Sequence, residues 1–151
     1  MNNPSIISVE AACKTQLPAI YRLEQGLFGD HAYPDFFFRQ SFDCWPSGLL
    51  VACDDTDRLL GYILLARSEQ ADCAWILSVA VDDAAQGRGI GRRLITDALS
   101  ALPDSVTLVK LTVAPENPAR HLYAKLGFVD QGLETDYFGP GEDRILMILQ
   151  R

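Results

Sequence analysis

The stretch with the clearest chemistry is the glycine-rich segment DDAAQGRGIGRRLITDAL, from Asp82 to Leu99. Its glycines stand at the alternate positions 87, 89 and 91, between the apolar run AWILSVAV and a helical pattern. The first N–H groups of a helix have no intrahelical partner, and the helix dipole adds partial positive charge there. Glycines let this backbone approach an anion closely because no Cβ intervenes. The segment therefore predicts a site for a phosphate-bearing ligand.

The two common nucleotide-binding motifs do not fit this loop. A P-loop needs Lys-Ser or Lys-Thr after its last glycine, whereas Arg92 and Arg93 follow Gly91. A dinucleotide fingerprint would place its third glycine at position 92 and would lie on the first strand of a repeated βαβ unit. The sequence thus excludes both motifs and leaves a phosphate-bearing ligand of another kind.

The elements that must position the loop follow from hydrophobic periodicity. Strands are expected at 5–10, 48–55, 59–67, 73–81, 105–113, 128–135 and 143–150, and helices at 13–28, 36–43, 90–102 and 117–128. The second and third of these strands are joined by the turn DDTD and form a hairpin. The order β-α-α-β-β-β-α-β-α-β-β predicts an α/β fold with a single mixed sheet and helices on both faces, in one domain over residues 1–151.

Composition restricts the kind of partner. The net charge of −7 argues against a general nucleic-acid binder, which needs a basic face. The four cysteines and two histidines lack the spacing of a zinc site, so no metal is expected. The apolar runs are too short to span a membrane, and the N-terminal residues lack the pattern of a secretory signal. We therefore expect a cytoplasmic protein with no membrane partner.

The loop also resembles a known signature. The run Gln86-Gly87-Arg88-Gly89-Ile90-Gly91, which follows LSVAV, resembles the Q/R-x-x-G-x-G/A motif of the GNAT superfamily of N-acetyltransferases. The resemblance implies that these six residues hold the pyrophosphate of acetyl-CoA. It further implies that the backbone of Val79, Ala80 and Val81 aligns the rest of the cofactor, in a gap between two splayed central strands.

The segment LTVAPENPARHLYAKLGF is similar to the next motif of that family, in which a helix that starts at Asn ends in L-Y-x-x-x-G-F. The similarity implies that Tyr123 is the general acid that returns a proton to the CoA thiolate, which a phenol of ordinary pKa about 10 can do. It also makes Asn117 a cofactor-binding residue. Asn117 stands one residue closer to Tyr123 than the family's asparagine does, and Glu116 occupies the usual place.

Two further segments resemble the loops that flank the peptide in RimI-like N-terminal protein acetyltransferases. These segments are AYPDFFFRQ and TDYFGPGEDRILM. The resemblance implies that Tyr33, Tyr137 and Phe138 line the channel of an incoming peptide, because aromatic walls with polar tips suit an extended backbone. The three phenylalanines at 36, 37 and 38 are expected in the core.

The chain differs from the RimI type at the general base. The RimI type has a glutamate at the position that Thr112 occupies in this chain. A threonine cannot usefully take a proton at neutral pH. His31, Glu116, Glu24 and a water relay remain as alternatives, and the ordinary pKa of a histidine is near 6.5. A lysine costs about 3.4 kcal/mol more to deprotonate than an N-terminal α-amine, so the missing glutamate favours α-amines.

The sequence therefore predicts an acetyl-CoA-dependent N-acetyltransferase in which a primary amine attacks directly. The expected acceptor is a protein or peptide N-terminus. One alternative is a small-molecule amine such as a polyamine, an aminoglycoside or an amino-acid-like compound. Another is a non-catalytic acyl-CoA-binding regulatory domain. The identity of the acceptor, the base, the physiological role and the choice between monomer and homodimer stay open.

Overall fold

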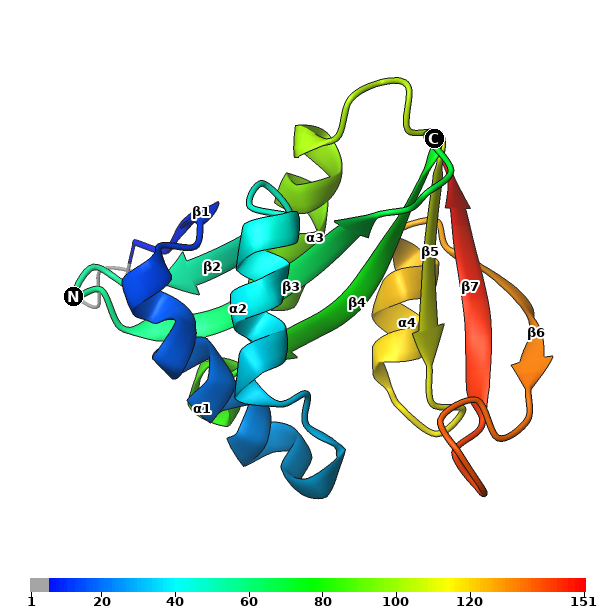
Figure 1. Ribbon diagram of the computed structural model, residues 1–151, viewed down its shortest axis with the longest axis horizontal. Coiled ribbons are helices and arrows are strands. Elements are labelled where there is room, and N and C mark those ends of the chain that lie inside the picture. The colour runs from blue at the N-terminus through cyan, green and yellow to red at the C-terminus, as the bar shows by residue number, and fades with distance from the viewer. Residues whose placement is uncertain (1–5) are drawn as a thin grey trace. The chain divides into compact units, whose positions relative to one another are not determined.

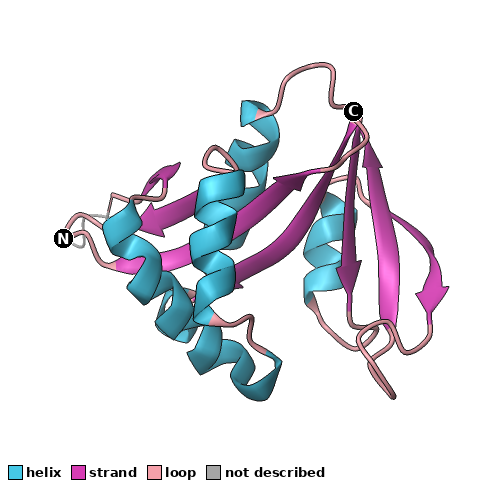
Figure 2. Cartoon of the chain, in the orientation of Figure 1, coloured by secondary structure: helices cyan, strands magenta, loops and turns pink. Residues whose placement is uncertain are grey.

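The computed structural model describes residues 6–151. Within them, helices and strands follow each other in the predicted order (Figures 1 and 2). The strands are β1 (Ser8–Ala11), β2 (Leu49–Cys53), β3 (Leu59–Arg67), β4 (Cys73–Val81), β5 (Leu108–Val113), β6 (Val129–Glu134) and β7 (Arg144–Gln150). The α-helices are α1 (Leu17–Phe28), α2 (Asp35–Cys44), α3 (Ile90–Ala101) and α4 (Ala119–Lys125). Ser5, where the first strand was expected to begin, lies outside the described residues.

The strands form one mixed sheet in the order β1-β2-β3-β4-β5-β7-β6. Neighbouring strands are antiparallel in the pairs β1–β2, β2–β3, β5–β7 and β6–β7, and β4 and β5 are parallel. The predicted hairpin of β2 and β3 and the predicted mixed sheet are therefore confirmed.

The chain divides into two compact units. Unit 1 contains the residues up to Ala66 together with Ser78–Leu102, and unit 2 contains Arg67–Leu77 and Pro103–Arg151. β4 contributes residues to both units. Its parallel ladder with β5 joins Cys73–Ile76 to Leu108–Leu111. The expected splaying of the two strands beyond this ladder, and the single domain over 1–151, stay predictions.

Both faces of the unit 1 sheet carry helices. A Cβ on Gly61 of β3 would lie 3.3 Å from Leu94 of α3 and 2.7 Å from a backbone oxygen of β4, so glycine permits close packing of α3 on this face. The next residue, Tyr62, points to the opposite face because side chains alternate along a strand. Its ring lies edge-on to Phe38 of α2, with the ring centres 5.5 Å apart. Burial from both sides explains the nearly unbroken apolar run of β3.

The strands of unit 2 alternate instead. In β5, Val109, Leu111 and Val113 are buried, while the residues between them are half-buried. β6 is exposed along its length and forms one edge of the sheet. Alternation of this kind is typical of an antiparallel sheet with one covered face.

The expectation for the phenylalanines of α2 is wrong at one position. Phe38 is fully buried, but Phe36 is 64% exposed. Phe36 lies in the first turn of α2, and two residues of a helix turn the side chain to nearly the opposite side. Phe36 and Phe38 therefore cannot share the buried face of α2.

Candidate active site

The glycine loop lies wholly in unit 1, between the end of β4 and the start of α3. A short 3₁₀ turn at Asp83–Ala85 precedes it, and the carboxylate of Asp82 accepts the N–H of Ala84 at 3.0 Å. Gly87 and Gly89 have φ of 82° and 73°, in the left-handed region, and no heavy atom lies within 4 Å of a Cβ built on either. Gly89 is the N-cap of α3 and brings no side chain to its first amides.

The loop is exposed, but the helix behind it is anchored. The residues from Gln86 to Gly89 are exposed, whereas Ile90 and Leu94 of α3 are at most 2% exposed. An open backbone fixed to a buried helix suits the binding of a phosphate at a helix N-terminus. The guanidinium of Arg93 donates to the carbonyl of Ile7 and pairs with Asp97 at 3.7 Å.

The residues predicted to align the cofactor are the last three of β4. Val79 and Val81 are half-buried, and Ala80 is 3% exposed. The strand leads directly to the loop, and the N–H of Asp82 donates to the carbonyl of Leu60 at 2.8 Å. This bond holds the start of the loop against β3.

The predicted acceptor residues of unit 1 follow α1. His31 is exposed at the end of a 3₁₀ turn over Gly29–His31. Tyr33 is half-buried, and its ring stacks on that of Phe37 with the centres 4.3 Å apart. The backbone N–H of Tyr33 donates to the Oε2 atom of Glu24 at 3.0 Å.

Glu24 belongs to a buried polar cluster that the sequence did not indicate. It is 2% exposed and accepts the hydroxyl of Tyr62, which is fully buried. The Tyr62 oxygen also lies 2.6 Å from the Oγ atom of Ser78. Burial, and then the negative charge of Glu24, raise the pKa of the Tyr62 phenol far above its ordinary value. The sequence feature that could have indicated this cluster is a hydroxyl group in each of the otherwise apolar runs LLGYILLAR and AWILSVAV, because buried hydroxyls need hydrogen-bond partners.

The predicted general acid lies on α4 in unit 2. Tyr123 packs edge-on to Phe128 with the ring centres 6.1 Å apart, and burial raises the pKa of its phenol. The side chain of Asn117 accepts the N–H of Ala119, the first residue of α4, at 2.9 Å. Glu116 is exposed in the preceding turn, and Thr112 is half-buried on β5.

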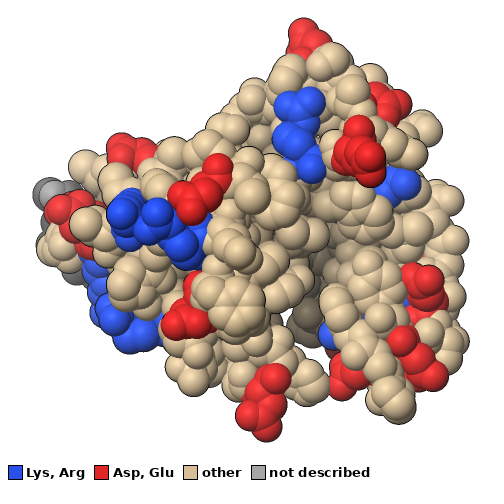
Figure 3. Space-filling model, in the orientation of Figure 1, with Lys and Arg blue, Asp and Glu red and all other residues tan. Residues whose placement is uncertain are grey.

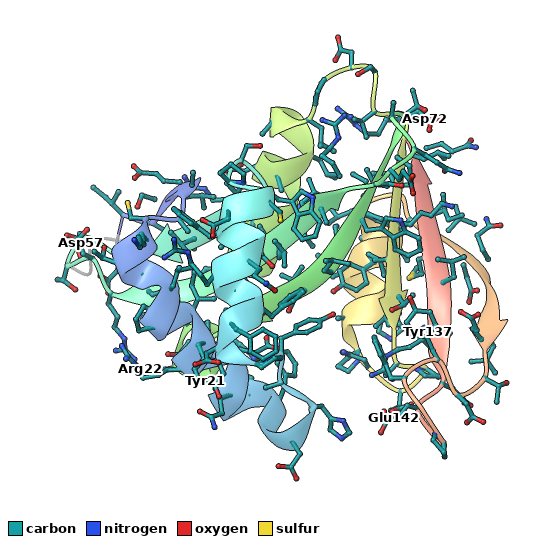
Figure 4. The ribbon with its side chains drawn as sticks, in the orientation of Figure 1. Tyr21, Arg22, Asp57, Asp72, Tyr137 and Glu142 are labelled. Atoms are coloured by element: carbon teal, nitrogen blue, oxygen red, sulfur yellow. The ribbon has the colours of Figure 1, made fainter. Side chains whose placement is uncertain are left out.

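The predicted aromatic wall of unit 2 lies on the loop between β6 and β7, where Figure 4 labels Tyr137. Tyr137 is 40% exposed and Phe138 58% exposed, and their rings meet edge-on at 4.7 Å. Asp136 fixes the loop: its carboxylate accepts the N–H of Gly141 at 2.8 Å, and its own N–H donates to Asp143 at 2.9 Å. The loop thus presents two aromatic rings on a hydrogen-bonded frame.

Unit 1 also has an open groove of about 500 Å³. It runs along α1 from Ala19 to Leu27 and meets the segments 58–59 and 82–83. None of the predicted site residues lines it. Within residues 6–151, no three His, Cys, Asp or Glu side chains are grouped so that they could hold a metal ion. No helix in the described part of the chain has the length and apolarity to cross a membrane.

The predicted site residues thus divide between the units. The glycine loop, the end of β4 and the segment with His31 and Tyr33 belong to unit 1. Unit 2 holds Tyr123, Glu116, Asn117, Tyr137 and Phe138. A mixed sheet in which a strand leads through an open glycine loop into a helix defines the class as an α/β protein, and the loop fits the predicted phosphate-bearing ligand.

Comparison with known proteins names the family. The sequence profile of the acetyltransferase (GNAT) family matches residues 17–128, and the chain belongs to this family. It is 31% identical over 157 residues to the [ribosomal protein bS18]-alanine N-acetyltransferase of Salmonella typhimurium. The alignment covers 99% of this chain and 97% of that protein. The chain is therefore RimI-like in sequence.

Two other matches are to part of a longer protein and to a solved structure. The chain is 34% identical over 124 residues to the mycothiol acetyltransferase of Gordonia bronchialis, which covers 80% of this chain and 39% of that protein. The chain thus spans about two fifths of the length of this relative. The crystal structure of Ard1 from Thermoplasma volcanium superposes with a TM-score of 0.87 at 21% identity, over 95% of this chain and 97% of that one, and shows the same fold.

Proposed function

We propose that this protein transfers the acetyl group of acetyl-CoA to the α-amine of a protein or peptide N-terminus. The observation that carries the proposal is the end-to-end relationship to the Salmonella enzyme, whose name specifies the alanine of a ribosomal protein. A cytoplasmic location is part of the proposal, since such an acceptor is made there. So is the absence of a nucleic-acid or membrane partner.

Most of the residues assigned to the cofactor belong to unit 1. The backbone amides from Gln86 to Gly91 would bind the pyrophosphate, and amides that donate to a charged oxygen contribute about 1.5–3 kcal/mol each. The open space around Gly87 and Gly89 supports this fit, because a phosphate can approach their backbone closely. Val79, Ala80 and Val81 would hold the rest of the cofactor through backbone groups, and Asn117 is a further cofactor-binding candidate.

The chemistry is a single acyl transfer. The neutral amine forms a bond to the acetyl carbon as the bond from that carbon to sulfur breaks. The departing thiolate takes a proton from the hydroxyl of Tyr123, whose raised pKa keeps the phenol protonated until that step. The surplus proton of the amine passes to a base. Holding both substrates in line supplies much of the rate enhancement.

The base is His31, Glu116 or a water molecule, because Glu24, the other predicted alternative, is buried and already accepts two hydrogen bonds. The first two side chains are exposed, so each can exchange a proton with solvent. A weak base suffices for an α-amine, whose pKa of about 7.7–8.0 leaves part of it neutral at pH 7. Tyr33, Tyr137 and Phe138 would contact the acceptor peptide.

The test is a thiol-release assay with acetyl-CoA and a panel of acceptors. The panel holds peptides with free N-termini, the same peptides blocked at the N-terminus but carrying lysine, and polyamines and aminoglycosides. Turnover of the free N-termini alone supports the proposal. Turnover of small amines alone contradicts the assignment of the acceptor and keeps the acetyl transfer.

A small-molecule amine is the second candidate, and the match to a mycothiol acetyltransferase favours it. A non-catalytic acyl-CoA-binding domain is the third candidate. It predicts that acetyl-CoA binds with unchanged affinity to wild-type protein and to a Tyr123→Phe variant, and that neither turns over any acceptor.

A further inference from the structure

The buried carboxylate of Glu24 is the feature that the proposed reaction leaves unused. Removing a charge from water is costly unless hydrogen bonds replace the lost hydration. Glu24 is 2% exposed and accepts two hydrogen bonds, from the N–H of Tyr33 at 3.0 Å and from the hydroxyl of Tyr62. The hydroxyl of Ser78 lies 2.6 Å from the Tyr62 oxygen, to which it donates because Tyr62 gives its own hydrogen to Glu24. Burying this carboxylate costs desolvation free energy, and the hydrogen bonds that offset it hold the donors in fixed positions.

The cluster ties four segments of unit 1 together. Glu24 belongs to α1, Tyr62 to the centre of β3, and Ser78 to β4, directly before the predicted cofactor residue Val79. The fourth segment joins α1 to α2 and contributes the backbone of Tyr33. Glu24 is therefore a link between the fixed strands and the segment that carries the predicted acceptor residues.

The partners of Glu24 determine what it can do. A backbone N–H can only donate, and the raised pKa of Tyr62 keeps its phenol protonated, so Tyr62 donates as well. The hydrogen bonds of the cluster thus all lead toward the carboxylate of Glu24, directly from Tyr33 and Tyr62 and through Tyr62 from Ser78. A charge-assisted hydrogen bond is about twice as strong as a neutral one, which suits the fixing of a loop.

We propose that Glu24 is a positioning residue: its carboxylate fixes the segment from Gly29 to Tyr33 and so sets the affinity for the acceptor. The inference rests on the proposed function, because Tyr33 is taken as a wall of the peptide channel. Stacking of Tyr33 on Phe37 orients the ring, and the bond from its N–H to Glu24 fixes the backbone. The expected effect of weakening Glu24 is a higher KM for the acceptor with an unchanged kcat at saturation.

The test uses Glu24→Gln, which keeps the shape and one accepting oxygen but removes the charge. We expect the KM for the acceptor to rise about tenfold, equivalent to about 1.4 kcal/mol, with the KM for acetyl-CoA and the pH profile of kcat unchanged. Tyr62→Phe keeps the ring packing and the bond from Tyr33 to Glu24, so it should raise the acceptor KM less. Glu69→Gln, at an exposed position in unit 2, is the matched control for the loss of one charge.

A second measurement does not depend on turnover. The amide hydrogen of Tyr33 should exchange faster with solvent in Glu24→Gln than in the wild type, while the amides of β3 stay protected. An unchanged exchange rate and an unchanged acceptor KM overturn the proposal. A large fall in kcat with loss of its acidic limb also overturns it and makes Glu24 a base. If the wild type acetylates no acceptor, the proposed function fails, and the exchange rate at Tyr33 still decides whether Glu24 fixes the loop.

Discussion

At the scale of single residues, Tyr123 carries the clearest expectation. A general acid contributes typically about 10²–10⁴-fold to a rate, so Tyr123→Phe should lower kcat by that factor. The variant keeps the ring that packs on Phe128, so folding and the affinity for acetyl-CoA should be unchanged. Thiol release measures the rate, and calorimetry with CoA measures the affinity. Wild-type turnover in this variant would remove Tyr123 from the mechanism.

The raised pKa of Tyr123 sets a second expectation, on the pH dependence of kcat. A general acid acts only while it is protonated, so its contribution is complete below its pKa and is lost as pH rises through it. Burial moves that pKa above the ordinary value of about 10. At saturating substrates, kcat should therefore show no descending limb up to about pH 10. A descending limb near neutral pH that disappears in Tyr123→Phe would contradict this assignment.

At the scale of elements, the loop before α3 depends on its backbone conformation. Gly89 has φ of 73°, and a left-handed conformation costs a residue with a Cβ roughly 1–2 kcal/mol. Gly89→Ala should therefore shift the loop and raise the Kd for CoA about 5- to 30-fold, measured by calorimetry. The control is Gly26→Ala in α1, where φ is not positive and no atom lies near the added Cβ. It should leave the Kd unchanged and stabilise the fold by about 0.5–1 kcal/mol.

The elements were also the part that the sequence predicted best. β3 and β4 begin and end at the predicted residues, because each is an apolar run bounded by polar turns. The expectation for Phe36 was wrong because periodicity in a short helix does not say which aromatic faces inward. The cluster at Glu24 could not be predicted, since its four residues come from four segments and are neighbours only in the folded unit. Hydrogen bonds across elements leave no periodic trace in a sequence.

At the scale of the whole molecule, binding of the cofactor should be visible as stability. A ligand that binds only the folded state stabilises it by about 2.7 kcal/mol at 100 times its Kd. For a chain of this size, that corresponds to a rise in Tm of roughly 5–10 °C. Thermal unfolding with and without acetyl-CoA measures the shift, which should be smaller in Gly89→Ala at the same concentration. An equal shift in both proteins would mean that the cofactor binds away from the glycine loop.

The net charge of the whole molecule affects whether copies of it associate. The chain carries a net charge of −7, and on the face drawn in Figure 3 acidic and basic side chains are interspersed. A high net charge of one sign keeps copies of a protein apart in solution. It therefore bears on whether the chain associates with itself.

The two edges of the sheet decide how such association would occur, and both carry features that oppose it. β1 has four residues, and β6 is interrupted by a register shift between Asp130 and Gly132. Short and bulged edge strands resist pairing with a second chain. We therefore expect a monomer, with a mass of 16.7 kDa by analytical ultracentrifugation at every concentration. Val129 and Leu133 are exposed on β6 and are the residues through which a dimer could form at this edge. If the protein is instead a dimer, and Leu133→Lys dissociates it, then β6 pairs across two copies despite its bulge.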